Sequence, residues 1–242
     1  MAMKNVQVGN IEKLLEPIIR GEVTISEHPD HIRAQAIWAI KKAVSDRIEY
    51  THNLLWPILA DVTQPLSIRI VAYETLMSQM PNMQRIMNIY WLMTQEPNNH
   101  LYNYHLTTLK GLANSVDPCL TPIREMARKI LRFTRIRPIT TQLSSKQFVD
   151  YTDPMYEFGE SWNTAWILEE LTGTPYAGYF EYHNSFARKS TNRMGVSNNV
   201  PIQHKLYNIG IFIIHERLMK SIEIKKHIAY SISYIHIYFY RI

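Results

Sequence analysis

Residues Pro29–Ala36 read PDHIRAQA and residues Pro65–Ala72 read PLSIRIVA, so the pattern P-x-x-I-R-x-x-A occurs twice, 36 positions apart. Proline fixes φ near the value that a first helical turn needs, and it commonly stands at a helix start. The isoleucine three positions later then begins a buried stripe, and the alanine lets a neighbouring helix approach closely. The repeat therefore predicts two helices that start alike and stack alike.

The zone from Ile11 to about Arg135 has apolar residues at helical spacing throughout. Along Ile32–Val44 they cover one broad face, and we expect Arg33, Lys41 and Lys42 to lie away from it. Further helices are predicted near residues 51–61, 66–79, 82–94, 99–114 and 120–134. Paired helices with a period in the mid-thirties are typical of an α-solenoid, in which neighbouring units bury one another's apolar faces.

A second zone shows the alternation of a half-buried strand. Along Tyr156–Trp166 the even positions are mostly aromatic, and Tyr176–Tyr182 repeats the pattern after the turn at Thr172–Pro175. Two strands cannot form a stable sheet alone, so further strands are required, from this chain or from sequence outside it. The predicted fold class is therefore mainly α: a helical superhelix, an α-solenoid of helix pairs, followed by a partial antiparallel β region.

Three domains follow from these zones: a helical superhelix segment over residues 1–135, the start of a β-sheet region over 136–200, and an atypical tail over 201–242. The tail is crowded with Ile, Tyr, His and Lys and shows neither the repeat nor turn signals. Its closing stretch, Ile228–Ile242, contains His236 and widely spread tyrosines, which make it a poor membrane span.

Composition and motifs favour a protein that is not an enzyme. The net charge of +5 on 242 residues permits anionic partners but does not require them. A single cysteine, Cys119, excludes an intrachain disulfide and a zinc knuckle. Glycine-rich phosphate loops are missing from the sequence, and Gly159–Asn163 lacks the second glycine of a nucleophile elbow, so Ser161 is predicted to face outward on a strand. We expect no catalytic residue, no cofactor and no metal site.

Two polar features have a structural and a functional interpretation. Four arginines spaced by four, four and three residues predict one basic helix face; they are Arg124, Arg128, Arg132 and Arg135. This face could bind an anionic partner, or it could be a solvated face or dock on carboxylates of a neighbouring domain. It lacks the interleaved aromatics of a nucleic-acid site, so no nucleic acid is expected. His100 and His105 lack a third ligand at metal spacing and are predicted to be surface or capping histidines.

Four segments, in this order, resemble a known family: IRAQAIWAIKKAV, LLWPILADVTQPLSIRIVAYETLM, MNIYWLMTQEPNNHLYNYHLTTLKGLA and IREMARKIL. Their order and spacing are similar to the helical superhelix of the large lipid transfer proteins, which include the vitellogenins, insect apolipophorins, apolipoprotein B and the microsomal triglyceride transfer protein. The family motifs correspond to Ile32–Ile40, Leu54–Leu59, Pro65–Ala72, Trp91–Pro97 and Tyr104–Ser115. The resemblance covers roughly residues 28–200 and leans toward the insect branch.

The resemblance implies lipid transport or yolk-type storage, with a helical arc that supports a lipid-lining sheet. Candidate lining residues share the aromatic side of the alternating strands; they are Phe158, Trp162, Trp166, Phe180 and Tyr182. The implied partners are phospholipid and triglyceride, together with a lipoprotein receptor and a second copy of the chain. The implied location is extracellular, yet the start MAMKNVQVGN has no signal-peptide pattern, and much of the family's module is missing from this chain, so we expect a partial module.

One alternative from another class stays open at this point. An armadillo- or HEAT-like scaffold would bind proteins or acidic partners through its concave face and the four arginines. Alternating aromatic strands after the helices favour the lipid interpretation, because a pure solenoid does not end in such strands.

Overall fold

The computed structural model describes residues 11–23, 29–43, 47–117, 120–138, 142–153, 158–186 and 189–198. The chain divides into two compact units, residues 1–201 and 202–242, and all described residues belong to the first. The predictions for the tail, for His236 and for Cys119 concern residues outside the described part of the structure.

Seven helices precede four strands in the described part of the chain. The helices are α1 Ile11–Arg20, α2 Pro29–Ala43, α3 Ile48–Ala60, α4 Leu66–Ser78, α5 Met83–Thr94, α6 Asn99–Asn114 and α7 Thr121–Leu131. The strands are β1 Ser145–Asp153, β2 Phe158–Leu168, β3 Pro175–Phe186 and β4 Lys189–Asn198. The predicted fold class, a superhelix of helix pairs followed by an antiparallel sheet, is confirmed.

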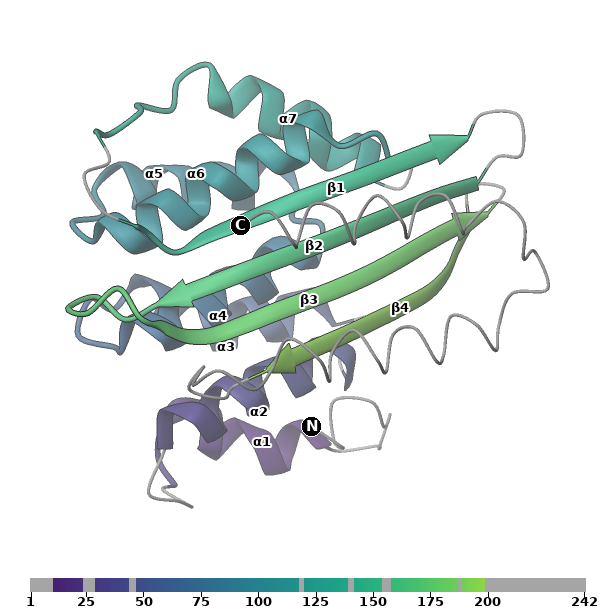
Figure 1. The fold of residues 1–242 in the computed structure, drawn as a ribbon. Coiled ribbons are helices and arrows are strands. Elements are labelled where there is room, and N and C mark those ends of the chain that lie inside the picture. Colours follow the sequence, from purple (N-terminus) through teal and green to yellow (C-terminus); the bar gives the residue numbers. More distant parts are fainter. Residues whose placement is uncertain are drawn as a thin grey trace. The chain divides into compact units, whose positions relative to one another are not determined.

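The helices stack in pairs, and one member of each pair contacts the sheet. Helix α1 packs on α2, α3 on α4 and α7 on α6, while α4 also contacts α2 and α6. The strands form one antiparallel sheet in the order β1-β2-β3-β4. Helix α6 packs on β1 and α4 on β2, so the helices cover one face of the sheet (Figure 1). The chain itself supplies the two strands, β1 and β4, that the sequence required but did not reveal.

The repeated phrase has the role predicted for its proline and alanine. Helix α2 starts at Pro29, and Pro65 is the N-cap of α4. Ala36 and Ala72 are both buried in the core. The prediction that Arg33 and Lys41 lie away from the buried face was wrong, because both are buried. Arg69, the arginine of the second copy, is buried as well.

Each repeat arginine joins three consecutive parts of the superhelix. Arg33 in α2 donates to the carbonyl of Ile19 in the last turn of α1, at 3.3 Å from Nε and 3.1 Å from Nη2. Its Nη2 also donates to Oε1 of Gln64, in the loop after α3, at 2.9 Å. The last carbonyls of a helix have no intrahelical partner, and a cation there also favours the helix dipole. Arg33 therefore caps the C-terminal end of α1 and binds the loop that follows α3.

Arg69 repeats this arrangement one unit later. Its Nε donates to the carbonyl of Leu59 in the last turn of α3 at 3.0 Å. Its two terminal nitrogens contact the carboxylate of Glu96, in the loop after α5, at 3.1 and 2.5 Å. Glu96 stands where Gln64 stands in the first unit, so the second copy has a bidentate, fully buried ion pair instead of a hydrogen bond to an uncharged amide.

A second set of buried charges joins the helices to the sheet. Lys146 Nζ of β1 lies 2.6 Å from Oε1 of Glu74 in α4, and the Tyr104 hydroxyl of α6 donates to the other carboxylate oxygen at 3.0 Å. Lys41 of α2 lies 3.6 Å from Glu181 of β3. All four charged side chains are buried. Two helices, α2 and α4, thus reach two strands through ion pairs, which are costly to break when only one partner is removed.

Burial alone would raise the pKa of Glu74, but the charges of Lys146 and Lys41 and the Lys146 hydrogen bond hold it below its ordinary value of 4.5. A carboxyl whose folded-state pKa is lowered contributes stability above its unfolded pKa. This contribution is lost as the pH falls below about 4.5 through the folded-state pKa.

The first test concerns the arginine repeat. We expect Arg69→Met to lower the free energy of unfolding by about 3–5 kcal/mol, because it leaves the Glu96 carboxylate buried and unpaired. Arg33→Met should cost less, about 1–2 kcal/mol, because its partner Gln64 is neutral. The double variant Arg69→Met/Glu96→Leu should regain much of the loss. Urea denaturation measures all three, with exposed Arg132→Met as the control, and an equal cost for the two single variants would contradict this account.

The second test concerns the charges between helices and sheet. Lys146→Met should destabilise the fold by about 3–5 kcal/mol at neutral pH, since Glu74 loses its closest cation. The difference in the free energy of unfolding between this variant and the unmodified chain should become smaller as the pH falls. The folded variant then takes up a proton on Glu74 and no longer buries a charge. Denaturation series between about pH 7 and pH 4 measure this difference. The control is Lys110→Met on the exposed side of α6, and a difference that does not change with pH would refute the role of Glu74.

Candidate functional site

The register of the strands gives the sheet two different faces. Val149 of β1 pairs with Trp162 of β2, and Trp162 pairs with Tyr182 of β3. Since paired residues lie on the same face, the aromatic positions of β2 and β3 gather on one side. We call the side toward the helices the inner face and the other the outer face.

The inner face is fixed to the helices by close packing. Ala165, Ile167 and Ala177 belong to the hydrophobic core. Phe148 packs over Gly111 of α6 so closely that a Cβ added to this glycine would lie 1.9 Å from Cδ2 of the ring. A glycine inside a helix costs stability, and here it allows a strand to approach the helix. Together with the buried ion pairs, this packing leaves only the outer face available to a ligand.

Large apolar side chains are exposed on the outer face. The exposed fractions are 59% for Val149, 54% for Tyr151 and 41% for Trp166. Trp162 and Phe180 are half-buried, and Tyr182 is buried. The outer face is therefore defined by six residues: Val149, Tyr151, Trp162, Trp166, Phe180 and Tyr182. Several exposed large apolar side chains on one face of a sheet are typical of a binding site.

The aromatic rings of the outer face also contact one another and their register partners. Trp162 and Tyr182 have ring centroids 5.8 Å apart. Trp166 lies over Gly178, whose added Cβ would be 3.5 Å from Cζ3 of the indole. The Tyr182 hydroxyl donates to Oε1 of Glu160 at 3.0 Å, so these two polar groups of the outer face satisfy each other. Burial raises the pKa of Glu160, although the hydrogen bond from Tyr182 opposes it.

The candidate lining residues lie together where their side chains are described. Trp162, Trp166, Phe180 and Tyr182 share the outer face, as the alternation required. Phe158 begins β2, but its side chain lies outside the described part of the structure. The prediction for Ser161 was wrong: it is buried on the inner face.

Sequence reasoning missed the contribution of β1 to this surface. Val149 and Tyr151 have the two-residue spacing of one strand face, but Phe148, directly before Val149, is apolar as well and lies on the inner face. Two adjacent apolar residues blur the period of two. The charged residues Lys146 and Asp150 gave no correct signal either, because they lie on the inner face, whereas charges in a strand usually mark the side that faces water.

The prediction that the four arginines lie on one helix face was wrong, because α7 ends at Leu131. Arg124 donates to the carbonyl of Ser115 at 2.9 Å, and Arg128 donates to the carbonyl of Ala113 at 2.8 Å. Both therefore bind the carbonyl end of α6. Helix α7 ends at Leu131, so Arg132 and Arg135 lie beyond it, and both are exposed. Whether any of the four binds an anionic partner stays a prediction.

The two histidines were wrongly predicted to be surface or capping residues. Both are buried. His105 Nδ1 and the Tyr73 hydroxyl are 2.9 Å apart, and burial lowers the pKa of His105 to about 3. His100 Nδ1 lies 3.2 Å from the Ser144 hydroxyl just before β1. These neutral histidines serve packing between helices and the approach to the sheet.

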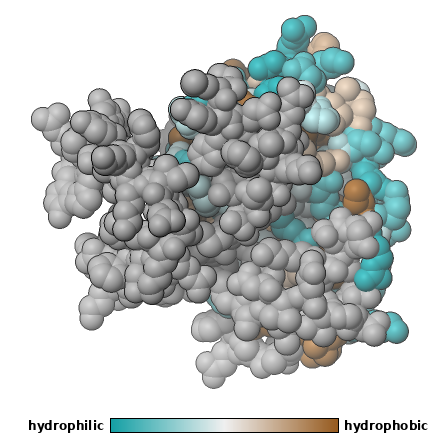
Figure 2. All heavy atoms as spheres, turned by 90° about the vertical axis from the view of Figure 1, so that its right-hand side faces the viewer, coloured by the Kyte–Doolittle hydropathy of each residue, from teal (hydrophilic) through white to brown (hydrophobic). Residues whose placement is uncertain are grey.

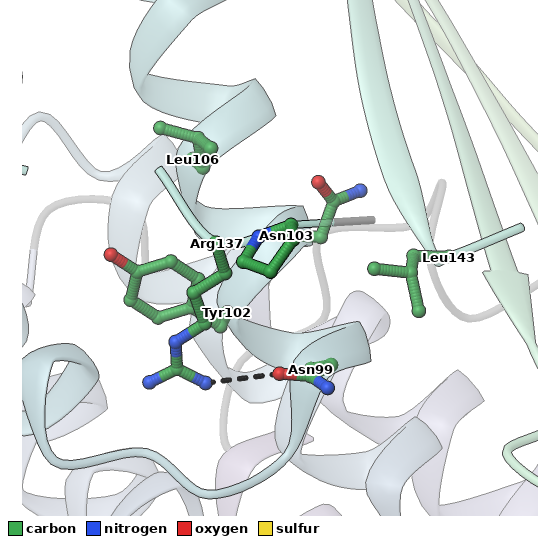
Figure 3. A pocket seen from close by; sticks show the side chains of 7 residues that line it. Asn99, Tyr102, Asn103, Leu106, Arg137 and Leu143 are labelled. Carbon is green, nitrogen blue, oxygen red and sulfur yellow. Dashed lines mark hydrogen bonds between the residues drawn. The ribbon is translucent and has the colours of Figure 1, made fainter. Parts of the chain in front are cut away.

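One small pocket lies beside α6 (Figure 3). Its lining includes Asn99, Tyr102 and Arg137, and its volume is only about 10 Å³, which suits a single water molecule. Arg137 lies over the Tyr102 ring at 3.7 Å and donates to Asn99 at 3.2 Å. Figure 2 shows one side of the molecule, on which the described hydrophobic residues stand singly among hydrophilic ones. Within the described chain, each helix is too short or too polar to cross a membrane.

Comparisons with known proteins agree with this architecture. Residues 1–110 match the family model described as the vitellogenin TPR domain. Vitellogenin-4 and vitellogenin-3 of Caenorhabditis elegans are each 22% identical over 147 residues, which is 61% of this chain and 9% of either relative. A solved structure described as "Lipid-protein interactions in lipovitellin" superposes with a TM-score of 0.70 at 16% identity, and covers 78% of this chain and 20% of its own.

The chain thus spans about a tenth of the length of these curated relatives and a fifth of the solved lipovitellin chain. Family model, relatives and fold confirm the resemblance that the sequence motifs predicted: the chain is vitellogenin-like, similar to the large lipid transfer proteins in its superhelix of helix pairs and its adjoining sheet.

Proposed function

We propose that this chain is a lipid-transport or yolk-storage module without enzymatic activity, in which the outer face of the sheet contacts lipid. The single observation that carries the proposal is the asymmetry of the sheet. Its inner face is joined to the helices by core packing and buried ion pairs, whereas Val149, Tyr151 and Trp166 of its outer face are exposed. Acyl chains remove such side chains from water as effectively as a protein core does.

The chemistry of the outer face suits the boundary of a lipid phase. Val149 and Phe180 are wholly apolar, while the indole of Trp166 combines a large apolar surface with one donor. Glu160 has a raised pKa and a hydrogen bond from Tyr182, so it reaches its neutral form more readily than an exposed carboxyl does. A neutral carboxyl is less costly beside hydrocarbon than an ionised one.

The relatives support the same class of ligand. The solved lipovitellin structure is described by its lipid–protein interactions, and the curated relatives are vitellogenins. Extending lipid carriage to this chain is part of the proposal, as are secretion and the helical arc as a support for the sheet. A lipoprotein receptor and a second copy of the chain stay predictions of the resemblance.

The test compares two exposed tryptophans in different places. We expect the full chain, expressed with a lipid source and purified, to retain phospholipid or triglyceride that organic extraction and mass spectrometry detect. Trp166→Ser on the outer face should lower the retained lipid per protein by about ten-fold, the effect of losing one large apolar contact. Trp91→Ser is the matched control, because Trp91 is 59% exposed but lies on α5 in the helical layer.

Two results would contradict the proposal. One is an unmodified chain that carries no lipid. The other is an equal loss of lipid from Trp91→Ser and Trp166→Ser, since lipid would then not depend on the outer face. Urea denaturation of both variants shows that each remains folded.

A further inference from the structure

The segment that follows α7 presents cations and large apolar side chains together. Residues 132–137 read RFTRIR, in which Arg132, Arg135 and Arg137 alternate with Phe133 and Ile136. The exposed fractions of Phe133 and Ile136 are 75% and 69%, the highest of the large apolar side chains in the described helical layer. Exposed apolar residues at single positions are common, but two of them within one basic segment form a patch.

Hydrogen bonds hold the backbone of this segment in place, so the positions of its side chains are defined. The Tyr90 hydroxyl of α5 donates to the carbonyl of Phe133 at 3.1 Å. The Tyr102 hydroxyl of α6 donates to the carbonyl of Arg135. Thr134 bonds back to the carbonyl of Ile130 at 3.0 Å through its hydroxyl. Two tyrosines from different helices thus hold the main chain, and a preorganised surface loses less entropy when it binds.

The charge of the segment is not neutralised within the described part of the chain. No carboxylate there lies within ion-pair distance of Arg132, Arg135 or Arg137. The nearby acidic residues are otherwise engaged: Glu125 pairs with Arg128, and Glu96 pairs with Arg69. A cluster of cations without counter-charges attracts an anionic surface.

An open depression adjoins the segment. It has a volume of about 260 Å³ and is lined by Phe133, Arg135 and Arg137 together with Thr94 and Tyr102. The guanidinium groups of Arg135 and Arg137 supply donors that suit a phosphate, and the phenylalanine ring supplies apolar contact beside them.

We infer that residues 132–137 are a docking site for an anionic phospholipid surface, separate from the outer face of the sheet. Arginines would contact the headgroup phosphates, and Phe133 and Ile136 would enter the apolar layer beneath. The combination decides the class of partner. A membrane uses both halves of the segment, because its anionic headgroups attract the arginines and its apolar layer accepts two protruding apolar side chains.

The experiment uses the full chain and vesicles of two compositions, phosphatidylcholine alone and phosphatidylcholine with about 30% phosphatidylserine, a surface charge like that of anionic leaflets. Flotation measures the bound fraction. We expect binding to the anionic vesicles and little to the neutral ones. Arg132→Gln/Arg135→Gln should weaken it about 25-fold, since each cation near such a surface contributes about a five-fold factor.

The apolar half of the site has its own variant and control. Phe133→Ser/Ile136→Ser should weaken vesicle binding at least about ten-fold. Leu171→Ser, at the 93% exposed tip of the β2–β3 turn, should leave binding unchanged, as should Lys13→Gln/Lys110→Gln on exposed helix positions. All substituted side chains are exposed, and urea denaturation confirms that the variants are folded.

Three outcomes would overturn the inference. The first is the same binding to neutral and anionic vesicles. The second is binding that needs the arginines but not Phe133 and Ile136, which would show that the apolar side chains do not enter the membrane. The third is an equal loss in the control variants. Lipid retained by the outer face is measured separately by extraction. A negative vesicle result therefore does not contradict the proposed function, and a negative extraction result does not contradict the docking site.

Discussion

The contact between Lys146 of β1 and Glu74 of α4 decides which face of the sheet is free. It joins a strand to a helix 72 residues away in sequence, and the Tyr104 hydroxyl completes it from a third element. Because both charges are buried, slipping β1 by one residue would move Lys146 to the outer face and leave Glu74 unpaired. The pair therefore fixes the register of β1, and through the strand pairing it turns Val149 and Trp162 away from the helices.

The repeated arginines give the superhelix the regularity that this contact needs. Arg33 and Arg69 each close the preceding helix and hold the loop of the following pair, so successive pairs stack at one spacing. Helices α2, α4 and α6 then stand in a row beneath the sheet, where Lys41, Glu74 and Tyr104 meet their partners. The sequence phrase that first indicated stacked helices thus also positions the side chains that orient the sheet.

Much of this fold could be predicted from sequence, because its helices are local. Proline breaks and apolar spacing placed α4 to α6 within about two residues, and the alternation around Trp162 revealed β2. Burial of the repeat arginines could not be predicted, because a guanidinium far from apolar residues in a helical projection can still reach a carbonyl of the previous helix. His105 was misjudged for a related reason: its partner, the Tyr73 hydroxyl, comes from another helix. Strand β1 was not predicted, because the adjacent apolar residues Phe148 and Val149 lie on opposite faces of the sheet and hide the alternation.

A photoactivatable phospholipid, cross-linked to the full chain and mapped by peptide mass spectrometry, tests the central claim most directly: one face of the sheet is committed to the helices and the other to lipid. We expect cross-links on β1 to β3 at outer-face residues such as Val149, Trp166 and Phe180, and none at the inner-face residues Phe148 and Ala177. Cross-links confined to the helices, or spread equally over both faces of the sheet, would contradict the account.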